Sequence, residues 1–190
     1  MDIARYRPPE GRTALAVIDA QERLAAAMPA DDYARFLRAT LDLLAMAREL
    51  AMPVLVTEQY PKGLGPTVPE IRDALGDAAP AAEKLTFSAF GCEPFAAAVR
   101  ERGLVGLIVT GMEAHVCVVE TALDALAADL KVFVPHDGVC SRDPRDRAAG
   151  LELLRSAGAA VTSSETLLFQ ALGRAGTPAF KTLSARLRKR

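Results

Sequence analysis

The sequence is poor in the residues that usually bind metals. It has two histidines, three cysteines and no tryptophan among 190 residues, and 5% of its residues are aromatic. The cysteines Cys92, Cys117 and Cys140 are an odd number, and they show no C-x-x-C or Cys/His spacing typical of a metal site. This pattern favours a protein that works in a reducing compartment.

The sequence also lacks an excess of either charge and any long apolar run. The net charge of −1 gives no general electrostatic reason to expect a nucleic acid or a membrane surface as partner. The basic stretch at residues 186–190 favours a solvated helix end over a nucleic-acid contact. No segment reaches the length of a membrane span, and residues 1–12 lack the apolar core of a signal peptide. We therefore expect a cytoplasmic location.

The composition that remains is typical of one soluble globular domain over residues 1–190, with 51% hydrophobic and 25% charged residues. Short apolar runs predict strands at residues 13–18, 53–56, 104–109, 131–134 and 159–162, with an extended edge within residues 83–90. Segments of helical periodicity predict helices at residues 31–50 (with Asp31 as cap), 70–75, 93–102, 116–126, 144–157, 164–172 and 177–188. This alternation indicates an α/β fold. We expect a three-layer αβα sandwich with a central, mostly parallel, doubly wound sheet of six strands.

Polar residues and turn-rich segments follow several of the predicted strands. Asp19, residues 57–69, Cys117 and residues 136–143 all come after an apolar run. Three prolines and two glycines within residues 57–69 favour an ordered functional loop over a regular element. In parallel sheets, ligands bind beyond the carboxyl ends of the strands, so this coincidence is the first functional signal.

Cys117 lies where a predicted strand turns through a glycine into a predicted helix. At the start of a helix, the free N–H groups and the positive dipole favour a thiolate and an anionic intermediate. Such a thiol can attack an electrophilic carbon and form a covalent adduct that water later releases. Taken alone, however, Cys117 also fits a small buried core residue.

Asp19 and Lys84 are the charged residues that can serve this thiol. Asp19 is a candidate base for the thiol proton, although a helix cap or a solvated carboxylate fits the same position. Lys84 is a candidate cation that holds both anions, although a lysine in such a segment is usually on the surface. Residue spacing therefore indicates an α/β domain with a candidate thiol and identifies no reaction.

Three segments together resemble the isochorismatase-like cysteine hydrolase superfamily, and the resemblance covers nearly the whole chain. The segments are VIDAQ at residues 17–21, EKLTFSAF at 83–90 and VTGMEAHVC at 109–117. Within this superfamily, TEQYPKGLGPTVPE at 57–70, GMEAHVC at 111–117 and VTSSE at 161–165 are similar to the isochorismatase domain-containing proteins.

The resemblance implies a catalytic triad of Asp19 as base, Lys84 as the cation that tunes the site and Cys117 as nucleophile. It also implies a cis peptide bond between Met112 and Glu113, with the backbone N–H groups of Glu113 and Cys117 facing the oxyanion. The implied activity is hydrolysis of a small amide-like substrate at a C–N bond through a covalent thioester-type intermediate. A catalytically idle binding or scaffold module of the same fold, and a redox role for Cys117, are the alternatives.

Two departures from the superfamily's patterns narrow this expectation. Nicotinamidases of this kind carry an Asp-x-His motif and a further histidine for a metal, whereas this sequence has Glu58, Gln59 and Tyr60 at that place. Its histidines are His115 and His136, so we expect no metal and no cofactor. Isochorismatases that cleave a vinyl ether lack the cysteine, so Cys117 argues against that chemistry.

Other residues near the motifs have weaker indications. Tyr60, Phe87 and Phe90 are candidate walls of a substrate pocket, with plain packing equally open. Gln21 is a candidate for fixing the elbow or a substrate amide. His115 is two helical positions from Cys117 and would not face it, so a second-layer or interface role is expected. Structural roles are expected for Cys92, Cys140 and His136.

The expected partners are a small-molecule substrate and further copies of this chain, with no nucleic acid and no membrane. The resemblance suggests a homo-oligomer. Apolar residues near the C-terminal end are candidates for pairing across subunits, namely Leu167, Leu168, Phe169, Phe180 and Leu183.

Overall fold

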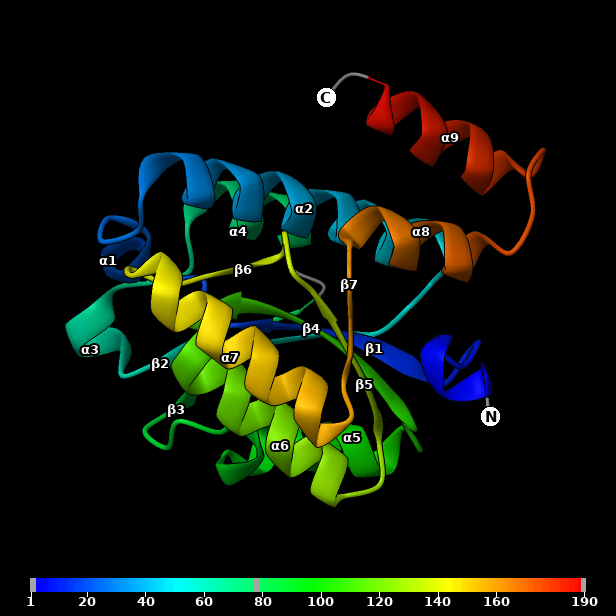
Figure 1. Cartoon of the computed structure of the whole chain (residues 1–190). Helices are drawn as coiled ribbons and strands as arrows, with labels where there is room; N and C mark the ends of the chain where they lie inside the picture. Colours follow the sequence, from blue (N-terminus) through cyan, green and yellow to red (C-terminus); the bar gives the residue numbers. More distant parts are fainter. Residues whose placement is uncertain (1–2, 77–78, 189–190) are drawn as a thin grey trace.

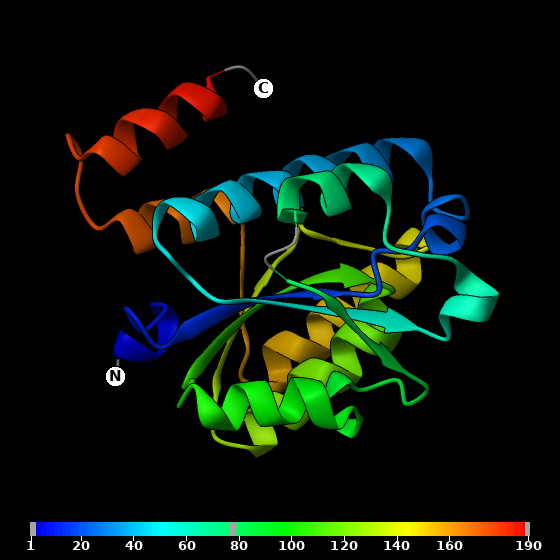
Figure 2. The ribbon, with the colours of Figure 1, turned by 180° about the vertical axis from the view of Figure 1, so that it is seen from behind.

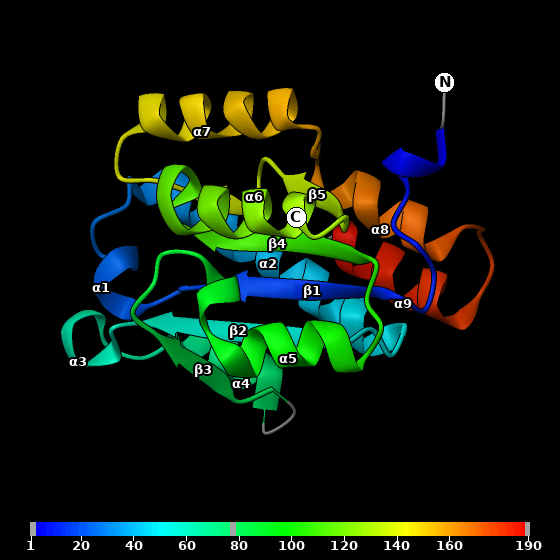
Figure 3. The ribbon, with the colours of Figure 1, turned by 90° about the horizontal axis from the view of Figure 1, so that it is seen from below.

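A seven-stranded parallel sheet forms the centre of the molecule in the computed structural model, which describes residues 3–76 and 79–188. The strands are β1 (Thr13–Ile18), β2 (Val54–Gln59), β3 (Ala81–Lys84), β4 (Gly106–Met112), β5 (Lys131–Pro135), β6 (Val139–Cys140) and β7 (Ala160–Thr162). The main order is β3-β2-β1-β4-β5-β7, and the two-residue β6 pairs with β4. Figure 3 shows β1 between β2 and β4, at the middle of the sheet.

Helices cover both faces of the sheet (Figures 1 and 2). One layer holds α2 (Ala30–Glu49), α4 (Pro69–Leu75), α8 (Ser164–Leu172) and α9 (Pro178–Leu187). The other holds α5 (Glu93–Glu101), α6 (Val119–Ala127) and α7 (Pro144–Ala157). The predicted three-layer architecture is confirmed, with β6 as an additional short strand inside the expected loop at 136–143. None of the helices described is long and apolar enough to cross a membrane.

The central strands β1 and β4 are buried along their whole length, which explains their continuous apolar sequences. Their side chains alternate between two core clusters, one under α2, α4, α8 and α9 and the other under α5, α6 and α7. The register pairs Ile18 of β1 with Thr57 of β2 and with Gly111 of β4. The residues that follow these strands therefore meet at one edge of the sheet.

Some local predictions were wrong, for identifiable reasons. β2 continues to Gln59 because Thr57, Glu58 and Gln59 pair with β3, so the turn-rich segment begins later and contains the short helix α3 (Pro61–Leu64). Asp31 does not cap α2. The helix begins after Pro29, and Asp31 lies in its first turn, where a negative charge is still favourable.

Most of the C-terminal apolar residues pack in the core of their own chain. Leu167, Leu168 and Leu183 are at most 1% exposed and pack in the α2-side core, which contradicts their expected role in subunit pairing. Phe169 is 43% exposed and its ring centroid lies 6.4 Å from that of Phe180. Of the basic stretch 186–190, residues 189 and 190 lie outside the described part of the chain.

Candidate active site

Asp19 is the first residue after β1, at the carboxyl edge of the sheet. Its backbone has a φ of 50°, which turns the chain out of the strand, and its side chain is fully buried. The neighbouring Thr57 holds it twice: the Asp19 N–H donates to Thr57 O at 3.1 Å, and Thr57 Oγ1 donates to Asp19 Oδ1 at 2.7 Å. The carboxylate is therefore fixed in position and shielded from water.

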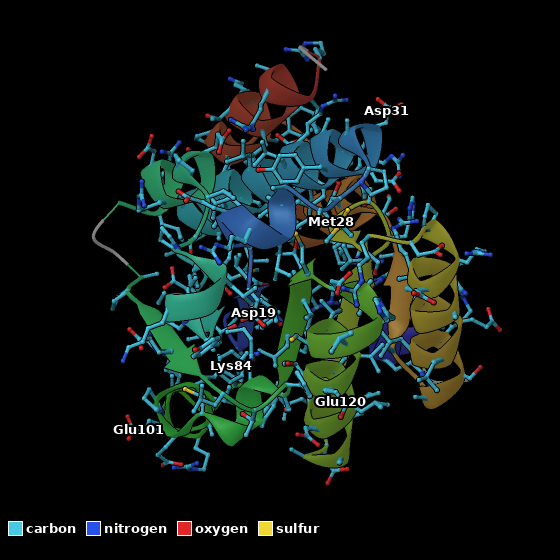
Figure 4. The ribbon with its side chains drawn as sticks, turned by 90° about the vertical axis from the view of Figure 1, so that its left-hand side faces the viewer. Asp19, Met28, Asp31, Lys84, Glu101 and Glu120 are labelled. Atoms are coloured by element: carbon cyan, nitrogen blue, oxygen red, sulfur yellow. The ribbon has the colours of Figure 1, made fainter. Side chains whose placement is uncertain are left out.

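Lys84 ends the edge strand β3, and its side chain is completely buried. Its Nζ lies 2.7 Å from Asp19 Oδ2, so the two form a buried ion pair, seen at the strand ends in Figure 4. The same Nζ donates hydrogen bonds to Gln59 Oε1 at 2.7 Å, to Thr86 O at 3.2 Å and to Phe87 O at 2.9 Å. These three carbonyls use all three ammonium hydrogens. Among the described residues, Asp19 Oδ2 therefore has no hydrogen-bond donor. It is stabilised by the positive charge of Lys84.

Cys117 lies beside this ion pair, in a π-helical turn (Ala114–Val118) that joins β4 to α6, and is 5% exposed. Burial and the nearby Asp19 carboxylate raise the pKa of Cys117 to about 12, while Lys84 acts in the opposite direction. All three groups are thus close enough to influence one another. This direction is opposite to the thiolate expected from the helix start, because burial and Asp19 together outweigh Lys84.

The elbow before Cys117 is held by the loop that follows β6. The peptide bond between Met112 and Glu113 is cis, at the place that the resemblance implied. The Glu113 carboxylate accepts the Arg142 N–H at 3.1 Å, and Ser141 Oγ accepts the Ala114 N–H at 3.1 Å. The Glu113 side chain is therefore bonded to this loop.

Gly111 is required where β4 passes β1 just before this elbow. Its φ is +140°, and a Cβ at this position would lie 2.0 Å from the carbonyl oxygen of Ile18. No side chain fits there without moving the strand. Glycine thus allows the close approach that puts the cysteine turn next to Asp19.

Gln21 fastens the segment after Asp19 to the end of β2. It is fully buried, and its Nε2 donates to Gln59 O at 3.0 Å and to Gly65 O at 2.6 Å. Its Oε1 accepts the Gln59 N–H at 2.8 Å. Both amide hydrogens are occupied within the chain, so this geometry favours a structural role over direct contact with a substrate amide.

The three predicted aromatic residues lie in different environments. Tyr60 and Phe87 are 52% and 58% exposed, and both flank Lys84 through backbone hydrogen bonds. Phe90 is half-buried and packs edge-to-face on Phe95, with ring centroids 5.4 Å apart. Phe90 therefore contributes to the core, whereas Tyr60 and Phe87 are exposed next to Lys84 and could contact a substrate.

His115 and Cys92 bond to residues other than Asp19 and Lys84. His115 Nδ1 bonds Ser141 Oγ at 3.0 Å, and its Nε2 is 3.8 Å from Asp146 Oδ2, so the ring is directed at the loop that follows β6. Cys92 Sγ donates to Glu83 O at 3.5 Å, and Cys140 is fully buried. In the described part of the chain, no group of three or more His, Cys, Asp or Glu side chains is arranged to hold a metal ion.

Sequence reasoning missed Thr57, Gln59 and Ser141, which bond directly to the predicted site residues or to their backbone. The first two were assigned to a loop because the adjacent prolines and glycines dominated the pattern. Their place at the end of a strand was a usable signal, since polar residues there face the same edge as Asp19.

The same fold and motifs occur in known proteins. Residues 13–166 match the family model described as the isochorismatase domain. The chain belongs to the isochorismatase family. Its fold is therefore that of an isochorismatase-family hydrolase, and the membership predicted from three motifs is confirmed.

The relatives include isochorismatase domain-containing protein 2 of Pongo abelii, 38% identical over 146 residues that cover 74% of this chain and 67% of that protein. Isochorismatase domain-containing protein 1 of Salmo salar is 41% identical over 141 residues, covering 74% of this chain and 49% of that protein. The chain thus spans about two thirds and about half of these two proteins. A structure from Caenorhabditis elegans, described as MAR1 ribonuclease, has a TM-score of 0.88 and 34% identity over 96% of this chain and 92% of its own.

Proposed function

We propose that this protein is a cysteine hydrolase that cleaves a C–N bond of a small amide-like substrate. The observation that carries the proposal is the buried Asp19–Lys84 ion pair, which lies close enough to Cys117 to act on its pKa. A buried ion pair is costly to form, and beside a thiol it offers a base and a cation for nucleophilic catalysis. Family membership agrees with a hydrolytic reaction.

Acylation begins when Asp19 Oδ2 takes the proton of Cys117, because this oxygen has no hydrogen bond of its own among the described residues. As the proton leaves, Sγ forms a bond to the substrate carbonyl carbon, and the carbonyl electron pair moves to oxygen. The backbone N–H groups of Glu113 and Cys117 donate to this oxyanion. The C–N bond then breaks, and Asp19 returns the proton to the leaving amine, which leaves a thioester on Cys117.

Deacylation uses the same groups in reverse order. Asp19 takes a proton from a water molecule, whose oxygen attacks the thioester carbon. Collapse of the second oxyanion breaks the C–S bond, and the proton held by Asp19 returns to Cys117 as the acid departs. Lys84 stabilises the negative charge as it passes between carboxylate and sulfur.

The raised pKa of Cys117 agrees with this order of events. A thiol with a pKa of about 12 is protonated near neutral pH, so proton removal has to accompany attack. It also supports the second candidate, a catalytically idle module, since an inert thiol would have the same property. A single domain over residues 1–190, a cytoplasmic location, a small-molecule substrate and assembly into a homo-oligomer stay parts of this proposal.

The experiment is a panel of small amides, ureides and hydroxamates, with single-stranded RNA included because the C. elegans relative is described as a ribonuclease. Wild type is compared with Cys117→Ala and Cys117→Ser, and with Cys92→Ala as a matched control at another buried cysteine. We expect the two Cys117 variants to lose at least about a thousandfold in kcat while the control keeps its rate. Turnover that survives in Cys117→Ala would exclude the mechanism. Cleavage of RNA alone would assign a different substrate class.

A further inference from the structure

Gln59, the last residue of β2, faces Lys84 on the neighbouring strand, and the strand register pairs the two residues directly. Its Oε1 accepts a hydrogen bond from Lys84 Nζ at 2.7 Å, and its Nε2 donates to Leu85 O at 2.9 Å. Both ends of the amide group are therefore bonded to the segment that carries the lysine, which fixes the orientation of the amide.

The backbone of Gln59 is fixed by a second glutamine. Gln21 bonds both the N–H and the carbonyl of Gln59, at 2.8 and 3.0 Å, and lies two residues after Asp19. Asp19 and Lys84 thus belong to two segments that are joined through Gln59. A chain of hydrogen bonds through the two glutamines thus links the segments that carry the two charges.

The effect of Gln59 depends on which acceptors bind the three hydrogens of the Lys84 ammonium. Two of them are held by the backbone carbonyls of Thr86 and Phe87, and the third by Gln59 Oε1. Without Gln59 Oε1, that third hydrogen would have Asp19 Oδ2, 2.7 Å from Nζ, as its nearest charged acceptor. A charge-assisted hydrogen bond would then occupy the oxygen that has to take the proton of Cys117.

We propose that Gln59 is a positioning residue of the hydrolase, which orients the Lys84 ammonium so that Asp19 Oδ2 stays open for the proton of Cys117. This role rests on the function proposed above. Gln59 itself touches neither the thiol nor, in this mechanism, the substrate carbonyl. Its effect is on proton transfer rather than on substrate affinity.

The first test is Gln59→Met, which keeps the length of the side chain and removes the acceptor, with Gln170→Met on α8 as the matched control. Both variants are assayed on a substrate whose turnover requires Cys117. We expect kcat of Gln59→Met to fall about 10- to 100-fold with KM within about twofold, because proton transfer is impaired and binding is not. The pH profile of its kcat/KM should also change, since Lys84 then donates a hydrogen bond to the oxygen that has to take the thiol proton.

A wild-type kcat in Gln59→Met would overturn the proposal. So would a lower kcat with an unchanged pH profile, because that result indicates only a structural role. The Gln170→Met control should match wild type in all three readouts, which separates the loss of this amide from the general effect of replacing a glutamine.

The second test needs no substrate and measures alkylation of Cys117 by iodoacetamide against pH. Gln59→Glu places a carboxylate on the Lys84 ammonium, so the thiolate should form less readily and alkylation near pH 9 should slow about tenfold. Gln170→Glu should react like wild type. Equal alkylation rates for Gln59→Glu and wild type would contradict the proposed effect of Gln59 on the Lys84 ammonium, even if Gln59→Met failed to fold. If no panel substrate is hydrolysed, the proposed function fails, and the alkylation curves still decide the role of Gln59 at the ammonium.

Discussion

At the scale of single residues, the candidate site places charged groups where the protein gives water little access. Asp19 and Lys84 have fully buried side chains, and Cys117 is 5% exposed, so each charge is stabilised by the protein alone. The sequence identified these three residues through their motifs. It missed the neutral residues Thr57 and Gln59, which bond to this pair, because they were assigned to a loop rather than to the end of β2.

Lys84→Met should destabilise the protein strongly, because it leaves the Asp19 carboxylate buried without its cation. Removing one member of a buried ion pair costs about 3–5 kcal/mol, and we expect a loss of that order in urea unfolding. The double variant Asp19→Asn/Lys84→Met removes both charges and should regain most of the lost stability. A double variant as unstable as Lys84→Met would show that the loss does not arise from the unpaired charge.

The raised pKa of Cys117 predicts a pH dependence of stability. Folding raises the pKa from 9.0 to about 12, so the folded state holds the thiol proton more tightly. This contribution is complete below about pH 9 and is lost as the pH rises towards about 12. Relative to Cys117→Ala, the free energy of unfolding of wild type should fall by at most about 1.4 kcal/mol per pH unit in that window. Urea unfolding at several pH values measures the difference, and parallel curves for the two proteins would contradict the shift.

At the scale of elements, the site is made by how the strands end. β1 and β2 bring Asp19 and Thr57 together through their register, and β2 and β3 do the same for Gln59 and Lys84. β4 contributes the cysteine turn because Gly111 lets it approach β1 closely. The central strands were predictable from their apolar runs. The length of β2 and the existence of β6 were not, because both depend on pairing with a neighbouring strand.

Gly111→Ala tests this close approach. The added Cβ would collide with the Ile18 carbonyl in the middle of the sheet, so we expect a loss of at least about 4 kcal/mol or failure to fold. Gly176→Ala is a matched control with a φ of +84° and no heavy atom within 4 Å of the added Cβ. The control should lose only about 1–2 kcal/mol, the cost of the left-handed backbone. Similar losses in both variants, measured by denaturant unfolding, would rule out the steric explanation.

At the scale of the whole molecule, the two helical layers are formed by different parts of the chain. The α2-side layer includes α8 and α9 from the C-terminal part, which pack on a helix more than a hundred residues earlier in the sequence. Leu183 of α9 is fully buried there, and Arg186 of the same helix forms an ion pair with Asp42 of α2. The apolar C-terminal residues therefore complete the core of their own chain.

Leu183→Ala tests whether α9 belongs to the same cooperative unit as the sheet. Truncating a fully buried leucine should cost about 2–5 kcal/mol. If residues 1–190 fold as one domain, the entire unfolding transition should shift to lower denaturant, by near- and far-ultraviolet circular dichroism alike. A separate early transition of a few helical residues, with the main transition unchanged, would show that α9 docks independently. Leu153, 49% exposed on α7, provides the control truncation.

The sequence by itself determined the fold class and the family, and it singled out Asp19, Lys84 and Cys117 as the candidate site residues. These depend on local patterns, namely apolar runs, helical periodicity and three short motifs, which need no knowledge of contacts. Only the tertiary structure decided the state of those groups. The raised pKa of Cys117, the Asp19–Lys84 ion pair and the hydrogen bonds of Thr57 and Gln59 to this pair all arise from burial and from contacts between residues far apart in the sequence. A helix start predicts a thiolate from local sequence, whereas in the folded protein the lost hydration of Cys117 and the nearby carboxylate of Asp19 raise its pKa against the opposing effect of Lys84.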